Sequence, residues 1–163
     1  MKVNLEELYS LQRDLDKDIA FRHRVNYQNT HSRRLLALMV ELGELANETR
    51  CFKYWSNKLP SPKAVIMDEY ADGLHFLLSL GIPLGTTKFE YELSENEEDL
   101  TDQFHKMYAL GNMLHDHYDL DNYIKAMQYY LNMAISLAMD DKDIINSYKT
   151  KLEVNHKRQE TNY

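Results

Sequence analysis

The sequence predicts an all-α protein built as a helical bundle of about six helices. Its 163 residues contain only five Gly and three Pro, and these are the residues that turns between strands use most. Long stretches repeat apolar residues every three or four positions, which is the period of an amphipathic helix. With 44% hydrophobic and 28% charged residues, the chain has the composition of a folded globular protein. We expect a single domain over residues 1–163.

The first two helices are predicted from the spacing of their leucines. Residues 4–19 repeat leucine and isoleucine at helical intervals, and a polar link follows over 22–29. Thr30 or Ser32 is a candidate N-cap for a second helix, which we expect to run to about Arg50.

The third helix is predicted from its start signal. Ser61 followed by Pro62 is typical of a helix start, with Ser as the N-cap and Pro in the first turn. We expect this helix to run to about Leu80, where Gly81 favours its end. The segment before it, 52–59, is aromatic and irregular.

Three more helices are expected in the second half of the chain. Residues 85–93 are predicted to form a loop. The sequence Ser-Glu-Asn-Glu over 94–97 fits a capping box, so the fourth helix is expected from there to about His117. A fifth helix is predicted over about 121–139 and a sixth over about 141–156.

The composition also excludes several classes of function. A net charge of -7 argues against sequence-independent binding to duplex nucleic acid, which requires a basic surface. Cys51 is the only cysteine, so an intramolecular disulfide and a cysteine-rich zinc site are excluded. Neither a signal peptide nor a membrane-spanning stretch is visible. We therefore expect a cytoplasmic protein with no membrane partner and no nucleic-acid partner.

Two pairs of carboxylates border the apolar faces of the second and third helices. At about 100° per residue, Glu41 and Glu44 lie beside the leucine stripe of the second helix. Glu69 and Asp72 share a face of the third helix with Phe76. An isolated carboxylate in such a position would cost several kcal/mol to bury, so the two pairs need a common partner.

A hard divalent cation satisfies several carboxylates at once. Oxygen ligands suit Mg²⁺ or Mn²⁺, and two such ions close together are common in phosphoryl chemistry. One carboxylate pair alone is usually plain surface charge, but two pairs on successive helices favour a metal site. A di-iron carboxylate bundle is the alternative. It normally supplies two Glu-x-x-His motifs, and here only Asp72 and His75 approach that pattern.

Four separated blocks of the chain resemble one family. Glu41-Leu-Gly-Glu44 and Glu69-Tyr-Ala-Asp72 are similar to the signature of the all-α nucleoside triphosphate pyrophosphatases. The surrounding segments, ELGELANETRCFKYWS and DEYADGLHFLLSLG, resemble the dimeric dUTP diphosphatases of bacteria and their phages. LQRDLDKDI resembles that family's N-terminal glutamine motif. Spaced residues near the end resemble its C-terminal nucleotide-binding motif: Tyr148, Lys151, Asn155, Arg158, Gln159 and Tyr163.

The resemblance implies an all-α homodimer that hydrolyses dUTP, with dUDP as a second candidate substrate. This reaction would lower dUTP and supply dUMP for thymidylate synthesis. The products from dUTP would be dUMP and pyrophosphate. It implies two or more Mg²⁺ ions per site, with Mn²⁺ as the alternative ion. Glu41, Glu44, Glu69 and Asp72 would be the metal ligands, and Glu41 or Glu44 would also orient or deprotonate the attacking water.

The resemblance also implies the nucleotide contacts. Phe76 would stack on uracil, and His75 would lie near the 3′ side of the sugar. Gln12 carries both donors and acceptors for the edge of the base, assisted by Asp16. The other implied contacts reach the phosphates, line the pocket or close over the nucleotide: Lys53, Trp55, Lys151, Asn155, Arg158 and Tyr163.

The last residues, 158–163, show no helical periodicity, and we expect them to be a mobile segment that closes over the nucleotide. The family usually ends in R-Q-x-x-G-Y, and here Asn162 replaces the Gly. Asn tolerates the left-handed backbone conformation better than most residues, so the turn is expected to survive.

Two alternative functions are left open. One is a broader nucleotide pyrophosphatase of the MazG-like type. The other is a regulatory role, in which the protein also binds a protein partner through the acidic segment 90–121. This segment contains ten acidic residues and one lysine.

Overall fold

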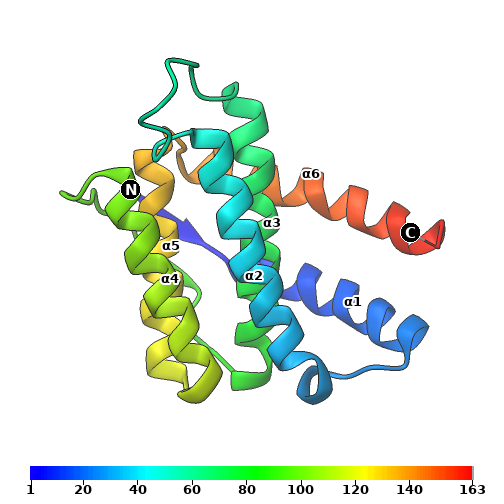
Figure 1. Ribbon diagram of the computed structural model, residues 1–163. Helices are drawn as coiled ribbons and strands as arrows, with labels where there is room; N and C mark the ends of the chain where they lie inside the picture. Colours follow the sequence, from blue (N-terminus) through cyan, green and yellow to red (C-terminus); the bar gives the residue numbers. More distant parts are fainter. Residues whose placement is uncertain (163) are drawn as a thin grey trace.

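The computed structural model describes residues 1–162 and confirms an all-α architecture (Figure 1). One short two-stranded sheet accompanies six α-helices in this part of the chain. The helices are α1 (Glu6–His23), α2 (Tyr27–Thr49), α3 (Lys63–Gly81), α4 (Leu100–Asp116), α5 (Leu120–Ser136) and α6 (Asp141–Glu160), with a 3₁₀ turn η1 (Ile82–Leu84) and the strands β1 (Lys2–Asn4) and β2 (Glu90–Glu92).

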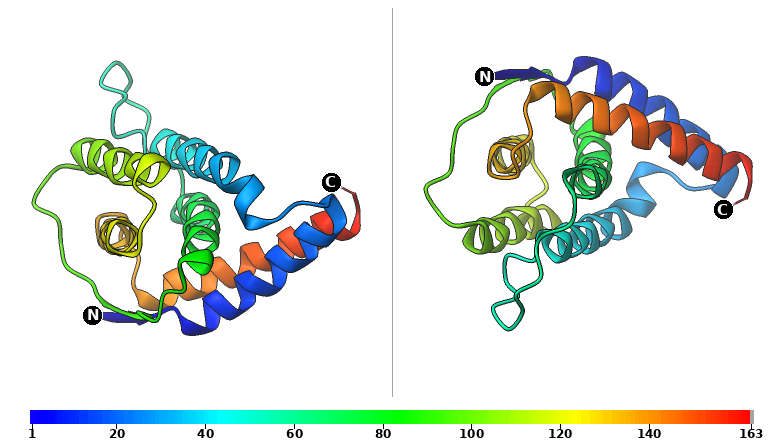
Figure 2. Two further views of the ribbon diagram at one scale, coloured as in Figure 1. Left: turned by 90° about the horizontal axis from the view of Figure 1, so that it is seen from below. Right: turned by 90° about the horizontal axis from the view of Figure 1, so that it is seen from above.

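Helices α2 and α3 run antiparallel through the centre of the molecule and share its most extensive helix–helix contact (Figure 1). Helices α4 and α5 cover one side of this pair. Helices α1 and α6 lie side by side and project from the other side (Figures 1 and 2). The core is filled mainly by buried leucines and tyrosines from all six helices. None of the described helices is long and apolar enough to cross a membrane.

Two buried tyrosines fix α3 against α5. The Tyr70 hydroxyl donates to the Tyr130 carbonyl at 2.9 Å, and the Tyr130 hydroxyl donates to the Tyr70 carbonyl at 2.6 Å. Their rings stack with centroids 4.4 Å apart. A Cβ atom at Gly73 would lie 2.3 Å from the Tyr130 hydroxyl, so this close approach requires glycine. The contact determines how closely α3, the helix that carries Glu69 and Asp72, packs against α5.

The predicted start of the fourth helix is wrong. Helix α4 begins at Leu100, after Asp99, whose side chain accepts a hydrogen bond from the Asp102 backbone N–H. The Ser94 amide instead donates to the Asn132 side chain at 3.1 Å. The loop expected over 85–93 is also wrong in part, because β2 pairs antiparallel with β1. A three-residue strand is too short to show a period in the sequence.

The start signals expected for α2 and α3 are wrong as well. Asn26, not Thr30 or Ser32, caps α2, and it forms a reciprocal capping box with Asn29. The polar link therefore shrinks to the turn between α1 and α2. At α3, Ser61 does not cap the helix, because its hydroxyl donates to the Glu48 carboxylate.

The C-terminal prediction is wrong for residues 158–160, because α6 remains helical to Glu160. The Arg22 guanidinium donates to the Gln159 carbonyl at 3.1 Å, and the His23 Nε2 lies 2.9 Å from the Gln159 Oε1. These contacts hold the end of α6 against the end of α1. Asn162 has a φ of 57°, which confirms the left-handed backbone expected there. Tyr163 lies outside the described residues.

Candidate metal and nucleotide site

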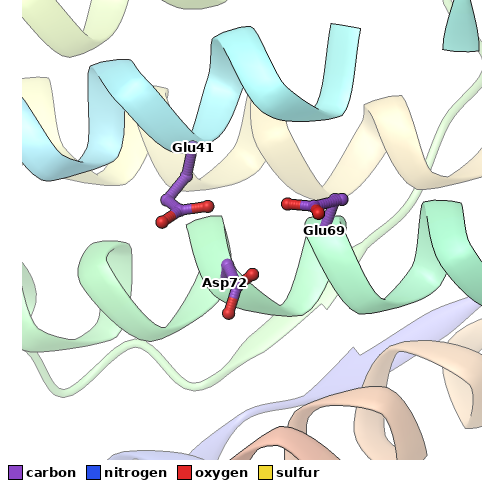
Figure 3. Close-up of side chains that lie close together, drawn as sticks. All are labelled: Glu41, Glu69 and Asp72. Atoms are coloured by element: carbon purple, nitrogen blue, oxygen red, sulfur yellow. The ribbon is translucent and has the colours of Figure 1, made fainter. Parts of the chain in front are cut away.

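Three of the four predicted metal ligands come together between α2 and α3. Glu41 projects from α2, and Glu69 and Asp72 project from α3, so that the three side chains lie close together (Figure 3). One oxygen of each lies within 4.8 Å of the others. The antiparallel packing of two helices, each with a carboxylate beside its apolar stripe, produces this cluster.

Glu41 and Glu69 carry raised pKa values, and each keeps a buried oxygen that is unpaired within the described part of the chain. Burial, followed by the charges of Asp72 and Glu44, raises the pKa of Glu41 to about 8. Burial and the charges of Asp72 and Glu44 raise the pKa of Glu69 to about 7. One buried oxygen of Glu41 and one of Glu69 have no hydrogen-bond partner among residues 1–162. Oxygens of this kind fit the ligand set of a hard divalent cation.

The fourth predicted ligand, Glu44, is placed differently. It is exposed at the surface of α2 and lies outside the group of three in the described part of the chain. Together with Glu48 and Glu69, it lines a neighbouring groove. Its charge still raises the pKa of both Glu41 and Glu69. Glu44 would therefore lie close to a second cation bound near Glu69.

Lys151 is drawn into the cluster from α6. Its side chain is only 6% exposed, and its ammonium lies 2.9 Å from the Asp68 Oδ1 and 3.1 Å from the Asp72 Oδ1. Burial lowers the pKa of Lys151, but hydrogen bonds and charges from Asp68 and Asp72 outweigh it and raise that pKa. The lysine is therefore charged at neutral pH and partly neutralises Asp72.

A cavity of about 540 Å³ adjoins the carboxylates. It is enclosed by α1, the turn between α1 and α2, both central helices and the end of α6. Its mostly apolar lining with several charged groups is typical of a site for a small organic ligand. Eight predicted site residues line it: Gln12, Asp16, Glu41, Asp72, His75, Phe76, Asn155 and Arg158.

Hydrogen bonds organise the end of the cavity that is formed by α1. The Gln12 Nε2 donates to the Asp16 Oδ1 at 2.9 Å. The Gln12 Oε1 lies 2.7 Å from the His75 Nδ1 and accepts from the Tyr148 hydroxyl at 2.8 Å. Burial lowers the pKa of His75 to about 3, so this imidazole is neutral.

The sequence-based prediction missed three cavity residues on α2: Tyr27, Thr30 and Arg34. The Arg34 guanidinium donates to the Tyr27 carbonyl at 2.8 Å and to the Ser79 carbonyl at 2.9 Å. The Tyr27 hydroxyl donates to the Asp16 Oδ2 at 3.0 Å. The only signal for Tyr27 and Arg34 in the sequence was their separation of seven residues, which places both on one face of a helix.

Two predicted nucleotide contacts lie away from the cavity. Lys53 and Trp55 belong to the irregular segment between α2 and α3, and the Trp55 side chain is 64% exposed. Trp55 makes edge-on ring contacts with Phe52 and Tyr54. Neither Lys53 nor Trp55 is among the residues that line the cavity. Their contact with a nucleotide therefore stays a prediction.

Without divalent cations, the free energy of unfolding is expected to fall as pH rises from about 6.5 to about 8. In this range folded Glu41, with its pKa near 8, binds protons that the unfolded chain has lost from a carboxyl of pKa 4.5. Stability falls with pH wherever the folded state binds more protons. His75 has the opposite effect, but only below its unfolded pKa of 6.5.

Urea unfolding in EDTA at a series of pH values measures this slope. The Glu41→Gln variant serves as the control, because it removes the largest contribution and should flatten the curve. Apparent cation affinity should rise over the same range, since the ligands must lose protons to bind. A wild-type slope equal to that of Glu41→Gln would contradict the assigned protonation of the cluster.

Clustered carboxylates on two antiparallel helices, next to a cavity with basic side chains, define a site for a divalent cation and a phosphate-bearing ligand. A family model described as dUTPase matches residues 4–163. The chain therefore belongs to the dUTPase family, and its activity is that of a divalent-metal-dependent dUTP diphosphatase. No curated protein sequence matches the chain.

Proposed function

We propose that this single-domain protein hydrolyses dUTP to dUMP and pyrophosphate with Mg²⁺, at the site between α2 and α3. The observation that carries the proposal is the group of three carboxylates, within 4.8 Å of one another, at the wall of a cavity of about 540 Å³. A cation held by these carboxylates would bind the phosphates next to a pocket that can enclose a nucleoside.

Glu41, Glu69 and Asp72 would hold the first cation, and Glu44 with Glu69 would contribute to a second. Bound Mg²⁺ offsets the charge of the phosphates and makes a bound water acidic enough to act as nucleophile near neutral pH. Glu41 is the group that we assign as the general base. Its side chain belongs to the carboxylate group and also lines the cavity, so it would lie beside a water that attacks the bound nucleotide.

The nucleoside would occupy the cavity with its base toward α1. Gln12 and Asp16 present polar groups to the edge of uracil, and Phe76 offers its ring for stacking. The His75 Nε2 is buried without a hydrogen-bond partner among the described residues. We assign it to the 3′ side of the deoxyribose.

The phosphates would lie toward the open side of the same site. Asn155 and Arg158 line the cavity from α6, and the Arg158 guanidinium has the planar geometry that suits phosphate oxygens. Lys151 is already held beside Asp72, which places its charge next to the metal site. Lys53, Trp55 and Tyr163 complete the proposed set of contacts.

A nucleotide panel tests the proposal. With Mg²⁺, dUTP should give dUMP and pyrophosphate, and EDTA should abolish the reaction. The panel should include dUDP as a second candidate substrate and Mn²⁺ as a second cation. Turnover of dTTP should be poor because its 5-methyl group meets the base pocket, and turnover of dCTP should be poor because its edge inverts the donor pattern. Equal rates on dUTP, dCTP and dATP would instead show a broad MazG-like pyrophosphatase.

We further propose that the protein acts as a homodimer, as the resemblance implies, and that it is located in the cytoplasm. Light scattering of the purified protein tests the first point, and a mass of one chain would contradict it. A regulatory protein partner of segment 90–121 stays a prediction. Charge-to-alanine variants in this segment that keep turnover but lose a partner would support it.

A further inference from the structure

The cavity contains one chain of hydrogen bonds whose direction is determined by chemistry. Burial raises the pKa of the Asp16 carboxyl, while hydrogen bonds from Gln12 and Tyr27 and the charge of Arg34 lower that pKa and favour the ionised form. An ionised Asp16 can only accept hydrogen bonds, so the Gln12 group that faces it, 2.9 Å away, must be the amide nitrogen. The opposite orientation would place two acceptors against each other. The Gln12 Oε1 therefore faces Tyr148 and His75.

Both lone pairs of the Gln12 Oε1 are occupied by these neighbours. The Tyr148 hydroxyl donates to it at 2.8 Å. His75, at 2.7 Å, must donate from Nδ1, because an unprotonated Nδ1 would present a second acceptor. One N–H of the Gln12 amide is the only hydrogen-bonding group that this side chain has left to offer.

Asp16 is held in a matching way from α2. Its Oδ1 accepts from Gln12 and its Oδ2 accepts from the Tyr27 hydroxyl at 3.0 Å. Arg34 holds Tyr27 in place through a hydrogen bond of 2.8 Å to its carbonyl and through a guanidinium that lies 4.9 Å from the ring centroid. Each Asp16 oxygen retains a lone pair that can accept from a ligand.

We propose that Tyr148 and Tyr27 are positioning residues that set the polarity of the base pocket, so that Gln12 only donates and Asp16 only accepts. This inference rests on the proposed function of the site. Tyr148 is fully buried and lies outside the cavity lining, so it acts through Gln12. It is held from α6 by stacking on His75, with ring centroids 4.1 Å apart.

The polarity explains a preference for uracil over cytosine. Uracil presents a carbonyl acceptor next to the N3–H donor, which match the Gln12 N–H and the Asp16 carboxylate. Cytosine in the same position presents an amino donor to the Gln12 N–H and a bare ring nitrogen to Asp16. Both contacts then become repulsive, and a site built for hydrogen bonds rejects such an analogue strongly.

Kinetics with dUTP and dCTP test the proposal in Tyr148→Phe and Tyr27→Phe. Each change removes one hydroxyl and keeps the ring. The loss of a hydrogen bond that orients a buried group corresponds to a change of about tenfold in a binding or specificity ratio. We expect the ratio of kcat/KM values for dUTP and dCTP to fall about tenfold in each variant. The change should appear mainly as a higher KM for dUTP, with kcat within about twofold of the wild type.

Tyr123→Phe is the matched control. The Tyr123 hydroxyl is equally buried and donates to the Leu77 carbonyl at 2.7 Å, but it lies outside the cavity lining. We expect this variant to melt at a lower temperature and to keep the wild-type ratio. A ratio that stays at the wild-type value in both Tyr148→Phe and Tyr27→Phe would overturn the proposal.

A second measurement needs no variant and no activity. Nitrogen-15 NMR of the histidines in the wild-type protein reports which ring nitrogen of His75 carries the proton. We expect the proton on Nδ1, and a proton on Nε2 would overturn the proposal even if the variants fail to fold. If the wild-type enzyme does not prefer dUTP to dCTP, the proposed function fails, and the NMR result still reports the polarity of the pocket.

Discussion

Replacing Glu41 by Gln or Asp72 by Asn is expected to lower kcat/KM for dUTP by at least about 100-fold, because placement of the cations carries most of the electrostatic stabilisation of the transition state. Both side chains belong to the group whose oxygens lie within 4.8 Å of one another. Steady-state kinetics at saturating Mg²⁺ measure the effect. Glu153→Gln, at an exposed position of α6, is the matched control and should keep its activity.

The same two variants should differ in stability when no metal is present. Above about pH 8, where Glu41 is ionised, Glu41→Gln relieves repulsion in the cluster, so its free energy of unfolding in EDTA should equal or exceed that of the wild type. Asp72→Asn relieves repulsion too, but it also removes the carboxylate 3.1 Å from the Lys151 ammonium, so no gain is expected. Near-normal turnover of either variant at saturating Mg²⁺ would show that the metal site between α2 and α3 is wrong.

Replacing Lys151 by Met is expected to destabilise the metal-free protein by about 3 kcal/mol, the low end for a broken buried ion pair. The low end applies because the Asp68 side chain is 53% exposed and water compensates its charge. Asp72, whose side chain is 19% exposed, loses its cation beside the two other carboxylates of the group, Glu41 and Glu69. Mg²⁺ should then stabilise the variant more than it stabilises the wild type, since a bound cation replaces the lost charge.

Chemical unfolding with EDTA and with Mg²⁺ measures both effects. Lys149→Met is the matched control on the same helix, because Lys149 pairs with Glu7 at 3.0 Å in an exposed position. Exposed pairs contribute about 1 kcal/mol or less. Equal stability of Lys151→Met and Lys149→Met without metal would contradict the assignment of Lys151 as the cation of the cluster.

Much of the fold could be predicted because its signals are local. A helix with a leucine every three or four residues has one apolar face in any context, so α1, α2 and α3 were expected within a few residues of their observed positions. Their ends were less predictable. Ser94 resembled an N-cap, but its backbone N–H bonds to Asn132, a partner 38 residues away that no local pattern identifies.

The features of the site likewise fall into those that a local sequence pattern predicts and those that it does not. The sequence by itself determined the helical class, the carboxylates beside the apolar stripes of two helices, and the resemblance to dUTP diphosphatases. These depend on spacing along a single helix, where a three-residue step returns a side chain to nearly the same face.

Only the tertiary structure decided which groups meet. It separated Glu44 from the other three carboxylates, placed Lys151 between Asp68 and Asp72, and brought Tyr148 of α6 against Gln12 of α1. The physical reason is that ion pairs and hydrogen bonds between helices depend on the depth and rotation at which the helices pack. Packing is determined by many core contacts at once, so it leaves no signature at the residues that finally touch.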